Sequence, residues 1–184
     1  MDETASRAPR LVVGISRSRA SWWALAWAVG EARRRGTRLL LVHAFRPQLF
    51  PATEGESRFA SATVDPDADR LAAGNRLIWT AIGEAVGHMP TGVSFDQAIV
   101  PGRPGAQLAR LARGGDMLVL CARHRGWLRR LAPGSVARAC VRRTDCLVMI
   151  VPEPSPRAIG AALPADARGH WRWWLPHREA GMTS

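Results

Sequence analysis

Seven arginines and no acidic residue lie between Asp116 and Asp145. Guanidinium groups bind phosphate through paired hydrogen bonds, so this segment is the chain's strongest candidate for holding an anion. The N–H groups of a helix starting at Ser135 would add to it. For Arg138 and Arg142, four residues apart, we favour a solvated helix face instead. The arginines expected to contact an anion come before the helix: Arg123, Arg125, Arg129 and Arg130.

Histidine and cysteine side chains could serve in metal binding or nucleophilic catalysis. Cys121 and His124 are three residues apart, but no third or fourth ligand is evident, and we expect no metal. Neither His43 nor Cys121 has an identifiable nucleophile–base partner, and no paired carboxylates follow the expected strands. We therefore expect no catalytic residue.

The composition excludes several enzyme classes. All 26 basic residues are arginines, and a P-loop, pyridoxal-phosphate chemistry and a protein kinase each need a lysine. The net charge is +11, of which residues 1–152, with 22 arginines and 12 acids, carry +10. The charge therefore belongs to the folded part and should attract an anion.

Strand and helix patterns alternate from residue 11 to residue 151. Short apolar runs predict five buried strands. Amphipathic periodicity predicts helices between them, with Leu71, Ile78, Ile82 and Ala85 on the inner face of the second. The strands are expected at 11–15, 38–45, 93–100, 117–121 and 146–151, and the helices at 19–35, 67–87, from the turn 102–105 to about 113, and at 135–143.

Helix-length connections between strands imply parallel pairing. We therefore predict an α/β fold, a doubly wound five-stranded parallel sheet with helices on both faces. Ligands of such sheets bind beyond the carboxyl ends of the strands. Residues 15–18, 43–45 and 121–126 should surround that position.

The domain organisation follows from where the pattern stops. We expect an N-terminal extension (1–9), one α/β domain (10–152) and a C-terminal tail containing Pro, Ala and Trp (153–184). Three tryptophans of the tail, from Trp171 to Trp174, should dock on the domain, a partner or a membrane surface. No apolar run is long enough to span a bilayer, no secretory signal is visible, and the odd cysteine count fits a reducing cytoplasm.

Several segments carry a resemblance to a known family. They are Val13-Gly14-Ile15-Ser16-Arg17-Ser18, Val42-His43-Ala44, the segment from Cys121 to Ser135, and Leu147-Val148-Met149-Ile150-Val151-Pro152. In order and spacing these residues resemble the universal stress protein family, whose strands end in Val-Gly-x-Asp-x-Ser and Val-His-Val and whose nucleotide loop reads Gly-x2-Gly-x9-Gly-Ser/Thr. The resemblance implies the strand order 3-2-1-4-5. It also implies nucleotide-site positions at Gly14, Ala44, Gly134, Ser135 and Val136.

The nucleotide loop departs from the family pattern. Cys121 and His124 stand where the family has glycines that let the backbone approach phosphates, and Ser16 stands where it has an acid. We therefore predict a degenerate ATP motif with weakened ATP binding. Other cofactors are not indicated.

We predict a non-enzymatic stress-response module that binds a protein client or an anionic ligand. An ATP-binding switch with slow hydrolysis and a basic nucleic-acid module are the alternatives, and nucleic acid is the less favoured partner. The last strand is apolar throughout, and the resemblance implies a homodimer through it, with Leu147, Met149 and Val151 exposed along its edge.

Overall fold

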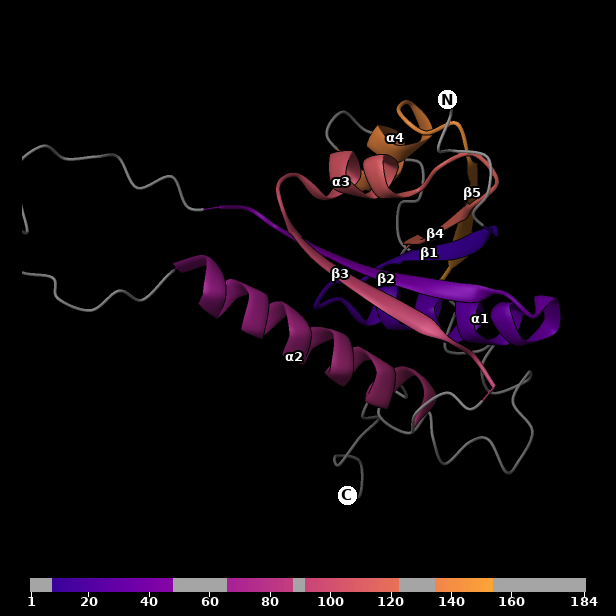
Figure 1. The fold of residues 1–184 in the computed structure, drawn as a ribbon, viewed down its shortest axis with the longest axis horizontal. Coiled ribbons are helices and arrows are strands. Elements are labelled where there is room, and N and C mark those ends of the chain that lie inside the picture. The colour runs from indigo at the N-terminus through magenta and orange to yellow at the C-terminus, as the bar shows by residue number, and fades with distance from the viewer. Residues whose placement is uncertain (1–7, 48–65, 88–91, 123–134, 154–184) are drawn as a thin grey trace, which may run out of the picture.

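The structure is a computed structural model that describes residues 8–47, 66–87, 92–122 and 135–153. Strands and helices alternate along these residues, as predicted (Figure 1). The elements are β1 (Arg10–Gly14), α1 (Arg19–Arg35), β2 (Arg38–Phe45), α2 (Pro66–Val86), β3 (Phe95–Pro101), α3 (Pro104–Leu111), β4 (Met117–Ala122), α4 (Val136–Val141) and β5 (Leu147–Pro152).

The strands form one parallel sheet of order β3-β2-β1-β4-β5. β1 lies at its centre, with Val12 paired to Leu40 of β2 and Leu118 of β4. The predicted fold class and strand order are confirmed. The chain adds β2 and β3 on one side of β1 and then crosses back to add β4 and β5 on the other side. The switch point of the sheet therefore lies between β1 and β4.

The core consists of two layers, one on each face of the sheet. Leu11 and Val13 of β1 pack with α1 and α2, whereas Val12 between them packs with residues of α3 and α4. Figure 1 shows these two helix pairs on opposite faces. Because both faces are covered, consecutive side chains of the central strands β1, β2 and β4 are buried, and these strands read as continuous apolar runs.

Local signals set the ends of the helices that border the switch point. α1 begins after Ser18, whose Oγ accepts a hydrogen bond from the Ser21 N–H at 3.4 Å, and ends at Gly36, which has a left-handed φ of 62°. α4 begins after Ser135, whose Oγ accepts from the Arg138 N–H at 3.2 Å. Both N-caps therefore lie beside the carboxyl ends of the strands.

Two expectations about element faces and bounds need correction. Ile78, Ile82 and Ala85 of α2 are buried as predicted, but Leu71 is 43% exposed. Periodicity identifies the inner face of a helix but not how far the sheet reaches beneath it. In addition, β1 ends at Gly14 rather than residue 15, and β3 begins at residue 95 rather than 93.

The edge strand β5 also differs from expectation. It pairs only with β4, as an edge strand does, and Leu147 is 60% exposed. Met149, however, is half-buried against the core of the α1 and α2 face, and Val151 is only 5% exposed. The other exposed large apolar residue of β5 is Ile150, which is 40% exposed. The prediction that Leu147, Met149 and Val151 are all exposed was therefore wrong. β5 has one unpaired hydrogen-bonding edge, but α1 still packs against one face of the strand.

Parts of the sequence analysis lie outside the described residues. These are residues 1–7 of the N-terminal extension, residues 48–65, and residues 154–184 of the tail. Among the described helices, none is long and apolar enough to cross a membrane.

Candidate functional site

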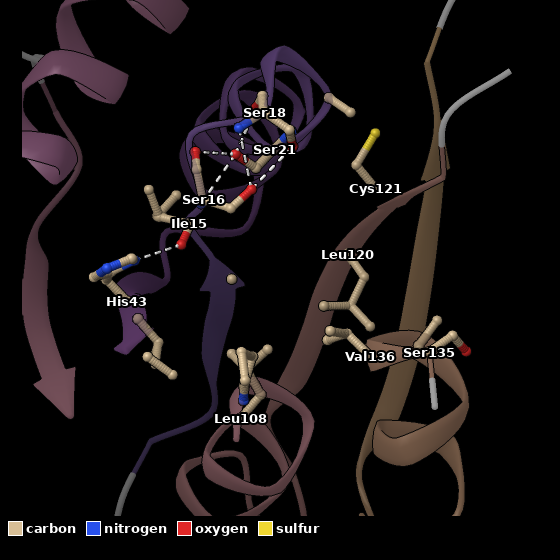
Figure 2. Close-up of a pocket in the computed structure, with 16 residues that line it drawn as sticks. Ile15, Ser16, Ser18, Ser21, His43, Leu108, Leu120, Cys121, Ser135 and Val136 are labelled. Carbon is tan, nitrogen blue, oxygen red and sulfur yellow. Dashed lines mark hydrogen bonds between the residues drawn. The ribbon is translucent and has the colours of Figure 1, made fainter. Parts of the chain in front are cut away.

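A hollow of about 580 Å³ opens at the switch point of the sheet (Figure 2). Its walls come from the carboxyl ends of β1, β2 and β4 and from the first turns of α3 and α4. Four residues expected at a nucleotide site, Gly14, Ala44, Ser135 and Val136, line this hollow together. The fold thus brings together residues more than a hundred positions apart in the sequence, beyond the carboxyl ends of the strands.

Three serines close the loop between β1 and α1. The Ser21 hydroxyl lies 2.8 Å from the backbone oxygens of both Ser16 and Ser18 and accepts a hydrogen bond from the Ser16 N–H at 3.1 Å. The Ser16 and Ser18 hydroxyls are 2.9 Å apart. Figure 2 shows this cluster at one end of the hollow. The three hydroxyls bond one another and the backbone. Ser16 thus contributes a neutral polar rim at the position where the family pattern has an acid.

His43 forms another part of the wall, at the end of β2. Its Nδ1 lies 3.0 Å from the carbonyl oxygen of Ile15, which can only accept, so Nδ1 carries the hydrogen (Figure 2). This contact ties β2 to the β1 loop, and it links the ring to backbone rather than to a nucleophile.

The opposite wall is apolar. Leu108 of α3, Leu120 of β4 and Val136 of α4 line it. A Cβ on Gly14 would lie 3.0 Å from Leu108 Cδ1, so glycine lets α3 pack closely against the end of β1. Cys121, half-buried, also lines the hollow, in place of a glycine of the family loop.

The described lining of this hollow is largely uncharged. Among the described lining residues, only His43 and Cys121 carry ionisable side chains, and no carboxylate or guanidinium is present. A flat, largely apolar group would fit between the leucines and the serine rim. An anionic part of a ligand would have to meet positive charges outside these described lining residues.

Those charges lie in an adjoining hollow of about 810 Å³ between α3 and α4. Five arginines line it, namely Arg46, Arg103, Arg138, Arg142 and Arg143. The sequence analysis did not single out Arg46 or Arg103, and it favoured a solvated face for Arg138 and Arg142. The available signal was that Arg46 directly follows one strand and Arg103 directly precedes a helix, both at the carboxyl edge of the sheet.

Several predicted site residues lie outside the described residues. They are Arg123, His124, Arg125, Arg129, Arg130 and Gly134. Within the described ranges, no group of three or more His, Cys, Asp or Glu side chains could hold a metal ion.

Comparison with known proteins agrees with the fold and the motifs. The family model described as the universal stress protein family matches residues 8–152. Two universal stress proteins from strains of Mycobacterium tuberculosis are 33% identical over 147 residues, which cover 79% of this chain and 49% of theirs. The chain thus spans about half the length of these curated relatives.

Two solved structures share the architecture. A universal stress protein in complex with cAMP is 25% identical, with a TM-score of 0.52, over 79% of this chain and 98% of that one. The universal stress protein UspA from Lactobacillus plantarum is 18% identical, with a TM-score of 0.55, over 79% of this chain and 99% of that one.

Proposed function

The chain belongs to the universal stress protein family, and from this premise we propose that it is a non-enzymatic regulatory module whose switch-point hollow binds a nucleotide weakly. The hollow carries the proposal, because its leucines and serine rim suit a base and a sugar while its described lining holds no acid–base pair. The related structure with cAMP supports a nucleotide as the ligand class.

Weak binding follows from the loop. Cys121 and His124 replace glycines, so fewer backbone N–H groups can approach the phosphates. We expect an ATP dissociation constant no tighter than about 0.1 mM, or roughly 5.5 kcal/mol. Titration calorimetry measures it, and submicromolar binding would contradict this reasoning. Cys121→Gly combined with His124→Gly should tighten binding.

A matched pair of variants locates the ligand. Val136 lines the hollow, whereas Val141, on the same helix, is exposed and does not line it. Val136→Trp should fill the hollow and weaken nucleotide binding at least about tenfold, while Val141→Trp should leave it unchanged. Equal effects would place the ligand elsewhere. Phosphate release from ATP above the buffer rate would refute the non-enzymatic part of the proposal and favour a slow hydrolytic switch.

We also propose a homodimer through β5. Unpaired N–H and C=O groups of an edge strand beside exposed Leu147 and Ile150 suit antiparallel pairing with a second copy. Leu147→Arg should split the dimer in sedimentation, and Leu71→Arg, an exposed leucine on α2, should not. A full-length monomer that dimerises only when truncated after Glu153 would overturn this and make the tail an edge cap.

The remaining expectations concern location and clients. All three cysteines are free, which fits a reducing compartment, and we propose the cytoplasm. A protein client is a second binding partner consistent with a module of this family. Co-fractionation with a cytoplasmic marker tests the location.

A further inference from the structure

The arginine-lined hollow between α3 and α4 is built from distant parts of the chain. The Gly102 N–H donates to the carbonyl oxygen of Phe45 at 2.7 Å, which holds the start of α3 against the end of β2. This contact brings Arg46 and Arg103, each adjacent to one of the bonded residues, to the same edge of the sheet. The two arginines therefore converge through the fold and not through the sequence.

The other side of the hollow is α4. Arg138 and Arg142 are four residues apart, so they project from one face of the helix, and Arg143 follows them. Glycine at position 105 lets α3 and α4 pack closely, since an added Cβ there would lie only 2.6 Å from Ala139 Cβ. Arg103, the N-cap of α3, and Arg142, the C-cap of α4, thus stand at the ends of two closely packed helices.

The described residues that line this hollow carry charge of one sign. Five arginines and no acidic side chain are among them. Five positive charges around one space repel each other and attract anions strongly.

The two hollows adjoin each other. Pro104, Ser135 and Val136 line both of them. A ligand that extends from the uncharged hollow at the switch point past the N-cap of α4 would meet the arginines. A single phosphate could contact only part of a five-arginine hollow, whereas a chain of phosphates presents charge along its length.

We propose that this hollow binds a linear oligophosphate chain. The chain comes from one of two sources, the outer phosphates of a nucleotide seated at the switch point or a free inorganic chain. The nucleotide source rests on the proposed function, whereas the free chain does not. Arginine suits this ligand because its planar guanidinium makes paired contacts to phosphate oxygens.

Titration calorimetry with AMP, ATP and inorganic tripolyphosphate tests the proposal on the full chain. The test variant is Arg103→Gln with Arg142→Gln, two exposed side chains in the hollow. The control is Arg35→Gln with Arg38→Gln, which removes the same charge at the amino ends of the strands. Thermal unfolding of each variant verifies that it folds.

We expect the unmodified chain to bind ATP about tenfold or more tightly than AMP, and the test variant to lose about ten- to thirtyfold for ATP and tripolyphosphate but not for AMP. The control should behave like the unmodified chain. The losses should shrink with added salt, because exposed charges are screened.

The other outcomes separate the two proposals. Equal binding of AMP and ATP, both unaffected by the test variant, would overturn the oligophosphate site while leaving the switch-point nucleotide site in place. Binding of tripolyphosphate without AMP or ATP would support the arginine hollow and refute the proposed function. Equal loss in the test and control variants would show only a general charge effect and overturn the site.

Discussion

Replacing Gly105 by alanine tests the packing that positions α4 and both hollows. Gly105 is the second residue of α3, and it is buried. An added Cβ would lie 2.6 Å from Ala139 Cβ and 3.2 Å from the carbonyl oxygen of Val136. Both atoms are fixed to the backbone of α4, so no side-chain rotation relieves the contact. The two helices must move apart by about 1 Å to restore a normal carbon–carbon distance.

The size of the effect follows from two opposing contributions. Overpacking in a well-packed core costs about 1–3 kcal/mol. Alanine is favoured over glycine within a helix by up to about 1 kcal/mol, which offsets part of this. We expect a net destabilisation of about 1–2 kcal/mol, which lowers the melting temperature by about 3–8 °C in a domain of this size.

A second glycine provides the matched control. Gly30 lies inside α1, and a Cβ there would meet no atom within 4 Å. Gly30→Ala should therefore raise the melting temperature through helix propensity alone. Thermal unfolding followed by tryptophan fluorescence and circular dichroism measures both variants. Equal rises in melting temperature for Gly105→Ala and Gly30→Ala would refute the close packing of α3 on α4. Adding Ala139→Gly to Gly105→Ala should restore part of the lost stability, because it removes the Cβ that the new alanine meets.

Two further predictions concern stability. Asp116→Ala should lower the free energy of unfolding by about 2–4 kcal/mol in urea titrations, because the buried carboxylate accepts hydrogen bonds from the backbone and guanidinium of Arg10. The control Asp96→Ala removes an exposed carboxylate and should cost at most about 0.5 kcal/mol. Similar losses in the two variants would contradict this reasoning. Burial, and then Cys146, raises the pKa of Cys140 to about 11, from 9.0, so its contribution to stability is full below pH 9 and is lost as pH rises toward 11. The chain has no lysine or tyrosine to titrate in that range, so urea midpoints should fall there by less in Cys140→Ala; an equal fall would argue against the buried thiol.

The sequence alone was sufficient for the fold class. Parallel strands covered on both faces must be apolar at nearly every position, and helices between them must repeat with period 3.6, so the chain order of elements is legible. The same logic placed residues 15–18 and 43–45 near a ligand, because the carboxyl ends of parallel strands share one edge. The family motifs agreed, and they fixed the strand order.

Tertiary packing decided how deeply each residue is buried. Leu71 has the right helical phase for the inner face of α2, yet it is exposed. The close approach of α2 to the sheet is instead at Gly74, where an added Cβ would lie 2.6 Å from Ile99 Cγ2 of β3. Val151 is apolar like its neighbours in β5, yet α1 buries it while Leu147 stays exposed. Residue type and period give a direction, and only the neighbouring elements give a depth.

The arginine-lined hollow shows the same division for the site. Charge counting identified a basic chain, but positions 46, 103 and 138 carry no shared spacing in the sequence. They converge because the bond from Gly102 to Phe45 joins the end of β2 to the start of α3, and because Gly105 lets α4 pack against α3. The sequence by itself determined the sheet, its family and the edge at which a ligand would bind. Only the tertiary structure decided which charges meet at that edge, because convergence depends on helix packing between segments far apart in the chain.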